Sequence, residues 1–236
     1  RTLARQLIFG YKSQTKTGPM LSGYVFTADT TLGSNTVAGV KGAYVFEVAK
    51  GSGQVGVNYI SSMDNAYGMQ YTSVAPNTTF GGFASLTNGS EKVKQIPAFD
   101  IHGNLSVGHC NVTAEWVAAI ERFRTQDLSY NGAGALPRAG QVEGGFTFRS
   151  FDKPASISVG YQWSSQALGL NIPQQRVNAV YNISVWQDTL ESLEYRHDFD
   201  YASSEYANGA NSSLFPPNAN SIGTGKGADT VLLQLG

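Results

Sequence analysis

Charge and cysteine are both scarce in this 236-residue chain, and each shortage narrows the class of protein. Lys, Arg, Asp and Glu make up 14% of the residues, against about 25% in an average soluble domain, and the formal net charge is -1. A charge so close to zero argues against a nucleic-acid binder that depends on neutralising phosphates. The one cysteine, Cys110, excludes an internal disulfide framework and a zinc site built on cysteines.

Long apolar runs, helical patterns and catalytic signatures are missing as well. No apolar run reaches the length of about 18 residues that a transmembrane helix needs. No segment keeps an apolar period of about 3.6 residues for three turns. Gly-x-Ser-x-Gly, His-Glu-x-x-His and a phosphate-binding glycine loop are absent, and His102, His109 and His197 are not spaced as a metal triad. We therefore expect no enzyme, no cofactor and no metal site.

The chain is rich instead in alternation with a period of two, which predicts β-strands. In 111–120 the apolar side chains share one face: Val112, Ala114, Trp116, Ala118 and Ile120. Eleven such strands are predicted, over 3–11, 19–27, 36–48, 53–62, 96–107, 110–121, 140–149, 154–164, 175–186, 188–198 and 228–236. Most have about 9–12 residues, whereas strands of soluble proteins average about 5–6 and tilted membrane-spanning strands need about 9–11.

The predicted connections alternate between short and long. In order they cover 12–18, 28–35, 49–52, 63–95, 108–109, 122–139, 150–153, 165–174, 187 and 199–227. Outer-membrane barrels have this asymmetry, with tight periplasmic turns and long external loops. The sequence therefore favours an all-β fold, a transmembrane antiparallel up-and-down β-barrel. A soluble antiparallel sheet, as in a secreted all-β binding module, has the same alternation strand by strand and stays an open alternative.

In a barrel of this kind the polar face lines a watery lumen and the apolar face meets lipid. The predicted lumen-lining residues are Asp100, His102, Glu115, Glu143, Arg149, Arg176, Glu194, Arg196 and Asp198. The predicted lipid-facing or girdle aromatics are Trp116, Tyr161, Trp163, Tyr181, Trp186 and Tyr195. Lumen charges of both signs either create a selective field or pair across strands to stabilise the wall. The cluster at 196–201 is interpreted as a rim site for a ligand or as part of the interface belt.

The odd number of predicted strands indicates further strands beyond the N-terminal end. Bacterial outer-membrane barrels have an even number of strands and normally keep both termini in the periplasm. Because the connection 12–18 belongs to the short series, the first strand would run from the outside inward. We therefore expect 1–236 to be one barrel domain that lacks an odd number of N-terminal strands.

Several motifs resemble those of one family of outer-membrane proteins. They are the segments 96–103 (IPAFDIHG), 112–116 (VTAEW), 136–139 (LPRA) with Glu143, 165–170 (SQALGL) with Pro173, 188–189 (DT), 194–198 (EYRHD) and 228–235 (ADTVLLQL). In this order and spacing they resemble the C-terminal part of LbtU-type siderophore porins of Gram-negative bacteria, most closely over 96–236. The resemblance implies a single-chain barrel of about 16 strands that takes part in iron–siderophore uptake.

The expected function is therefore a porin or channel of the cell outer membrane. It would admit a small polar solute through a polar lumen, and a ferric siderophore is the first choice of solute. Passage would need no chemical reaction and no cofactor. Its partners would be the lipid bilayer and that solute, with no nucleic acid, and the protein would be a monomer or a trimer. The alternatives are a general diffusion porin, the soluble secreted binding module, and an outer-membrane structural or surface-binding protein with a plugged lumen and partner-binding loops.

Overall fold

The computed structural model describes residues 5–30, 33–64, 94–125, 127–186, 188–207 and 222–236, and these residues form an all-β fold. Eleven strands make one antiparallel sheet: β1 (Arg5–Lys12), β2 (Gly18–Thr30), β3 (Gly33–Val48), β4 (Gly51–Ile60), β5 (Ala98–Val107), β6 (Cys110–Ala119), β9 (Arg138–Ser150), β10 (Lys153–Ser165), β11 (Gln175–Ile183), β12 (Glu191–Phe199) and β13 (Gly227–Leu235). The predicted all-β class and the eleven strands of its sheet are confirmed.

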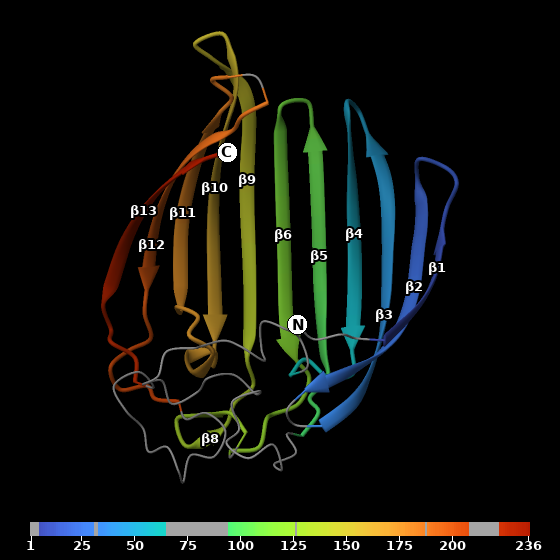
Figure 1. Cartoon of the computed structure of the whole chain (residues 1–236), viewed down its shortest axis with the longest axis vertical. Coiled ribbons are helices and arrows are strands. Elements are labelled where there is room, and N and C mark those ends of the chain that lie inside the picture. The colour runs from blue at the N-terminus through green and yellow to red at the C-terminus, as the bar shows by residue number, and fades with distance from the viewer. Residues whose placement is uncertain (1–4, 31–32, 65–93, 126, 187, 208–221) are drawn as a thin grey trace.

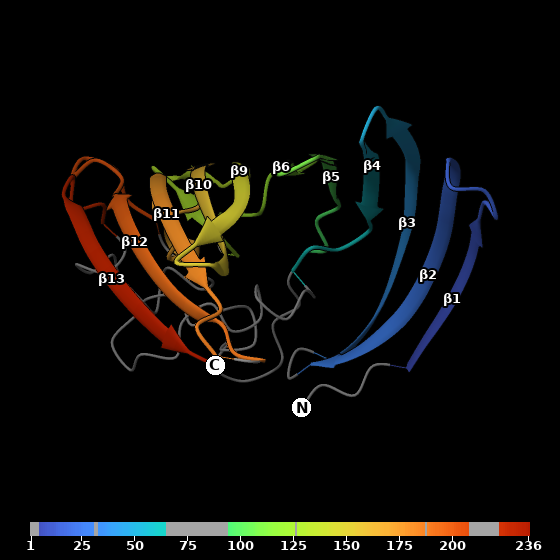
Figure 2. The ribbon, with the colours of Figure 1, turned by 90° about the horizontal axis from the view of Figure 1, so that it is seen from above.

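Each strand of the sheet pairs with its neighbours in chain order, so the topology is a meander. The order runs from β1 through β6 to β9 and on to β13, and β1 and β13 are the two edges. Figures 1 and 2 show the sheet curved into an arc, with β5, β6 and β9 at its back and the two edge strands at its ends. Among the described residues, no helix is long and apolar enough to cross a membrane.

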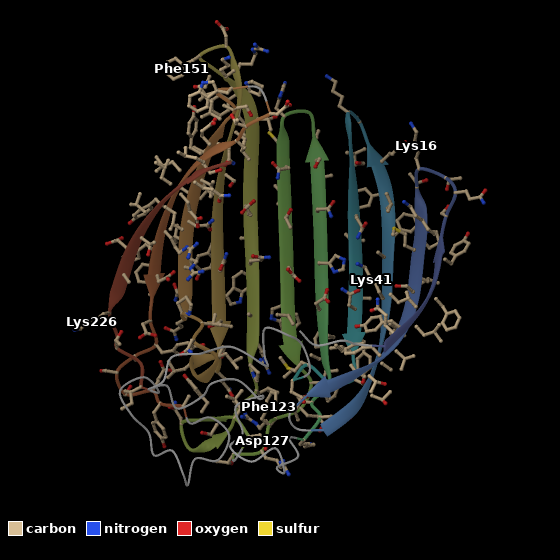
Figure 3. The ribbon with its side chains drawn as sticks, viewed as in Figure 1. Lys16, Lys41, Phe123, Asp127, Phe151 and Lys226 are labelled. Atoms are coloured by element: carbon tan, nitrogen blue, oxygen red, sulfur yellow. The ribbon has the colours of Figure 1, made fainter. Side chains whose placement is uncertain are left out.

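Apart from the β2–β3 and β11–β12 connections, short and long connections lie at opposite ends of the sheet. The turns 49–50, 108–109 and 151–152 lie at one end, here called the hairpin end, which is at the top of Figure 1. Phe151 and Lys16 mark this end in Figure 3. The connections after β4, β6, β10 and β12 lie at the other end, here called the loop end, where Phe123 and Asp127 are labelled.

Two predicted connections differ from the structure. The segment 28–35 is not a long loop, because β2 and β3 continue through it until Thr30 pairs with Gly33. Its polar composition does not prevent strand pairing at the end of a hairpin. In contrast, the predicted one-residue turn at 187 is the longer connection 184–190. Side-chain hydrogen bonds build this connection, since Glu191 accepts from the Val185 N–H at 2.9 Å.

The connections of the loop end fold together into a small hydrophobic core, which the sequence analysis did not predict. We call this unit the cap, and it comprises 62–64, 94–97, 119–125, 127–137, 164–174 and 199–207. Its buried apolar side chains are Ile96, Ala119, Phe123, Leu128, Ala135, Ala167, Leu168, Leu170, Tyr201 and Ala207. It contains the hairpin β7 (Ser129–Tyr130) and β8 (Ala133–Gly134), inside the predicted loop 122–139, and the 3-10 turn η2 (Leu168–Leu170). Most of the predicted loop 63–95 lies outside the described residues.

Candidate functional site

The candidate site is the polar face of the sheet. The strand register places all nine predicted lumen residues on this one face, because directly paired residues of antiparallel strands point to the same side. One row crosses six strands in register, through His102, Glu115, Gln141, Gln162, Arg176 and Asp198. Period-two alternation was therefore sufficient to assign these residues to one face. Their alignment in a row across the strands depends on the register, which alternation does not give.

The polar face lies on the concave side of the arc. Along β4 the polar Gln54 and Asn58 are partly buried, whereas the apolar Val55 and Val57 remain 52% and 51% exposed. A single curved sheet produces this difference because side chains on its concave face crowd together and those on its convex face spread apart. The chain therefore turns its polar residues inward and its apolar residues outward, which is the reverse of a soluble globular domain.

Two arginines of the concave face are held by carboxylates. Arg176 on β11 binds Asp198 on β12 through two nitrogens, with Nε to Oδ1 at 2.5 Å and Nη2 to Oδ2 at 2.8 Å. Arg196 binds Glu194 two residues along the same strand, with Nη2 to Oε1 at 2.8 Å. Each pair is about one-quarter exposed and has no net charge. These four predicted lumen residues therefore pair across and along strands.

Asp100 is the centre of a second polar cluster, on β4 and β5. Its Oδ1 lies 2.6 Å from Nδ1 of His102, and its Oδ2 accepts a hydrogen bond of 2.6 Å from Nδ2 of Asn58. Gly56 allows this arrangement, because a Cβ at that position would lie 2.5 Å from Nε2 of His102. Asn58 is not among the predicted lumen residues, although its alternation with Val57 and Tyr59 already places it on the polar face.

Glu115 and Glu143 are carboxylates of the concave face that form no ion pair among the described residues. Glu115 accepts a hydrogen bond of 3.1 Å from Nε2 of Gln141, and Gln141 carries no charge. Glu143 lies diagonally across from Glu115, since it pairs in register with Thr113. Arg149 lies on the same face but at the hairpin end, where it is exposed and donates to the carbonyl of Asp152 at 2.5 Å.

The predicted girdle aromatics lie away from the concave face. Trp116, Tyr161, Trp163, Tyr181 and Tyr195 all point to the convex face. Trp186 lies in the connection 184–190 and is 66% exposed. Large apolar side chains remain exposed on every strand of this face, including Phe9, Leu21, Val40, Val57, Ile101, Val112, Phe146, Val159, Val177, Leu193 and Leu233.

Aromatic side chains of the convex face form two rows, with aliphatic residues between them. The row near the loop end contains Tyr59, Phe99, Trp116, Tyr161, Trp163 and Phe199. The row near the hairpin end contains Phe146, Phe148 and Tyr181, on β9 and β11. Tyr11, Tyr44 and Phe46 lie on the same face, toward the hairpin ends of β1 and β3. The loop-end row passes through Gly140, and Phe148 lies eight residues further along β9, about 26 Å at roughly 3.3 Å per residue.

The cluster at 196–201 is divided between the two faces and the cap. Arg196 and Asp198 point inward, whereas His197 points outward, and its Nδ1 lies 2.7 Å from Oδ1 of Asp229 on β13. Oη of Tyr195 donates to the same carboxylate oxygen at 2.6 Å. This small polar group interrupts the apolar face at the strand ends, and it does not form one site with its sequence neighbours.

The cap is anchored to the concave face through Tyr201. The Tyr201 side chain is fully buried, and Oη lies 2.7 Å from Oγ of Ser164 and 3.1 Å from the backbone nitrogen of Ala167. Burial raises the pKa of Tyr201 above the usual value for a tyrosine. Tyr130 donates to Glu205, and its pKa is also raised, first by burial and then by that hydrogen bond. These contacts hold the connections after β6, β10 and β12 together.

Metal ligation is not supported by the part of the chain that the structure describes. It contains no group of three His, Cys, Asp or Glu side chains placed to hold an ion. The cluster of Asn58, Asp100 and His102 supplies one carboxylate and one imidazole. The polar face is thus an array of hydrogen-bonding and charged groups, and its arrangement suits contact with polar solutes.

Comparison with known proteins finds relatives whose names assign no activity. The chain is 52% identical over 237 residues to a UPF0422 protein of Legionella pneumophila strain Philadelphia 1, and 51% identical over 240 residues to one of strain Paris. These matches cover 100% of the chain but 44% of each relative. A UPF0422 protein of Coxiella burnetii is 34% identical over 160 residues. No family model matches the chain, and no solved structure matches it.

Proposed function

We propose that this chain forms most of the wall of an outer-membrane β-barrel that conducts small polar solutes. The longer protein would contribute the strands that join β1 to β13 and close the wall. This agrees with the relatives, of whose length the chain spans 44%. The function needs no chemical step and no cofactor, since a polar lumen and an apolar outer surface suffice for passive passage.

The observation that carries this proposal is the inverted distribution of polar and apolar side chains. Val57, Ile101 and Val159 are each more than 50% exposed on a convex face without charged residues along its centre. Soluble monomers rarely expose contiguous apolar patches larger than a few hundred Å². A lipid environment removes the cost of such a surface, whereas water would favour its aggregation.

The two aromatic rows support a bilayer in particular. Outer-membrane barrels carry an apolar band about 25 Å tall between two aromatic girdles. The separation of about 26 Å along β9 corresponds to about 20 Å along the membrane normal for strands tilted by about 40°. A second copy of this chain or a protein partner would not require aromatic rows at these two levels.

A ferric siderophore remains the first choice of solute, on the strength of the resemblance to siderophore porins. The concave face would offer such a solute charged groups of both signs, as at Arg196 and Glu115. A general diffusion porin has the same wall. The cap favours a further candidate, a surface-binding protein with a closed mouth, because the loop-end connections pack around a core at Leu128 and Tyr201.

Bilayer recordings of the full-length protein test the proposal. We expect a folded form that migrates differently on a gel before and after heating, and stepwise conductance in planar bilayers. Uptake of labelled siderophore by a deletion strain then separates a siderophore porin from a general one. A protein that stays monodisperse without detergent would overturn the membrane assignment, and a folded barrel without conductance would favour the closed, surface-binding form.

A further inference from the structure

A hollow on the concave face lies where the cap meets the wall. Its volume is about 210 Å³, and its lining includes Glu115, Gln141, Gln162 and Arg176 from four neighbouring strands, and Ile172 and Pro173 from the connection 171–174. The connection is held in place because Oγ of Ser164 donates to the carbonyl of Pro173 at 2.8 Å. Drug-sized ligands occupy pockets of about 300–1,000 Å³, so this hollow suits a smaller molecule.

The charges around the hollow do not cancel. Arg176 lines one side, but its Nε and Nη2 are both directed at Asp198, which neutralises it. Glu115 lines the other side, and within the described part of the chain its carboxylate receives the amide hydrogen bond from Gln141 and forms no ion pair. His102, which pairs with Glu115 in register, is turned to Asp100 instead. The carboxylate of Glu115 is therefore the uncompensated charge of the hollow, and a cation is the ligand that complements it.

The remaining lining determines what kind of cation fits. Ile172 and Pro173 present apolar surface, and Ile172 is 40% exposed. A bare metal ion would gain nothing from this surface and would find one carboxylate where several oxygen ligands are required. An ammonium ion with a short hydrocarbon body satisfies both halves of the lining, because the carboxylate accepts its N–H donors and the apolar side chains cover its body.

We propose that this hollow binds a small organic ammonium ion, with the ammonium group at Glu115 and the apolar body against Ile172 and Pro173. The inference rests on the proposed function in one respect, since it requires the concave face to be the water-filled side of the wall. It narrows that function, because a site for organic amines on the wall would enrich such solutes at the mouth of the channel.

Saturation-transfer NMR on the full-length protein in detergent tests this site directly. The probes are butylammonium, butyrate and 1-butanol, which share a hydrocarbon body and differ in charge. We expect saturable transfer to butylammonium alone. Glu115→Gln keeps the shape of the side chain and should weaken butylammonium binding by about tenfold or more, because it removes a charge-assisted hydrogen bond.

Two further variants make the result specific to the hollow. Glu143→Gln removes a carboxylate of the same face that does not line the hollow, and should change the affinity by less than about twofold. Ile172→Lys changes an exposed loop residue and should abolish butylammonium binding by repulsion without disturbing the sheet. Equal binding of 1-butanol, or equal losses in Glu143→Gln and Glu115→Gln, would overturn the proposal.

The same preparation separates this inference from the proposed function. If the protein conducts KCl in bilayers but butylammonium does not bind, the hollow is not a site and the channel remains. If the protein does not conduct but butylammonium binds at Glu115, the ammonium site is supported and the proposed channel function is wrong.

Discussion

Oη of Tyr201 and Oγ of Ser164 lie 2.7 Å apart, and this hydrogen bond joins the cap to the concave face of the sheet. Ser164 belongs to β10, whereas Tyr201 lies just beyond the end of β12. Because Tyr201 is fully buried and also binds the Ala167 nitrogen, one side chain connects two long connections to the wall. The order of the loop end therefore depends on it.

Substitution of Tyr201 should loosen the cap and leave the sheet folded. Tyr201→Phe removes two hydrogen bonds and should cost about 1–2 kcal/mol, and Tyr201→Ala should cost about 3–5 kcal/mol through the cavity it leaves. Limited proteolysis within 119–137 and 199–207 measures this directly. Tyr206→Phe is the matched control, because Tyr206 is 37% exposed and its hydroxyl makes no hydrogen bond within the described residues. Equal cleavage of Tyr201→Ala and the native protein would contradict the anchoring role.

Alkaline pH should open the cap through the same residue. Burial raises the pKa of Tyr201 in the folded state above the unfolded value of about 10. The folded state therefore holds this proton more tightly, so the contribution is complete below pH 10 and is lost as the pH rises through the folded pKa. Proteolysis rates measured between pH 8 and 12 should rise steeply in the native protein and less in Tyr201→Phe. A parallel rise in both proteins would exclude Tyr201 as the group responsible.

Gly140 should be intolerant of alanine because of Trp163. A Cβ at Gly140 would lie 2.3 Å from Cζ2 of Trp163, so the indole would have to leave its place in the loop-end row. Overpacking of this kind costs about 1–3 kcal/mol. Gly144→Ala is the control on the same face of the same strand, since nothing lies within 4 Å of its Cβ position. Denaturant unfolding, with tryptophan emission as the probe, should separate the two variants, and equal midpoints would disprove the steric argument.

A charge on the convex face should be costly only if that face meets lipid. Val159 is 55% exposed at the middle of β10, and Val159→Arg should destabilise a membrane barrel by about 2–4 kcal/mol. In a water-exposed sheet the same change should stay within about 0.5 kcal/mol. Ser158→Arg changes the neighbouring residue on the concave face and serves as the control. The stability of the two variants is compared after refolding into lipid vesicles, with heat-dependent gel migration as the readout. An unchanged stability of Val159→Arg would argue against the membrane assignment.

The Arg176–Asp198 pair should influence ion selectivity when it is broken. Asp198→Asn leaves Arg176 uncompensated on the concave face and should shift the reversal potential in a KCl gradient toward chloride. Arg176→Gln combined with Asp198→Asn should return it close to the native value, because the native pair has no net charge. Asn182→Asp is the control, because it adds a single charge on the same face but away from the pair. It shows how far one added charge by itself shifts the reversal potential. A double variant that behaves like Asp198→Asn alone would show that the two residues do not act together.

The sequence by itself determined the class of the fold, its eleven-stranded sheet and the face to which each side chain points. Period-two alternation is a local property, so residues such as Glu115 and Trp116 could be assigned to opposite faces without knowledge of any partner. The absence of the catalytic sequence motifs could likewise be established without a structure. The predicted strand boundaries were wrong at 28–35, where the polar composition suggested a loop. Polar residues still pair as strands when the residue opposite them in the hairpin is in register.

Only the tertiary structure decided which groups meet. Arg176 contacts Asp198, whereas Glu115 has no cationic partner among the residues that the structure describes. Both outcomes depend on the register across strands, which no local pattern encodes. The cap was beyond prediction for a related reason, because its core joins Ile96, Leu128 and Leu170 from three separate connections. Each of those connections is polar and irregular when considered alone, and burial of their few apolar side chains becomes favourable only when the sheet brings all three to the same end.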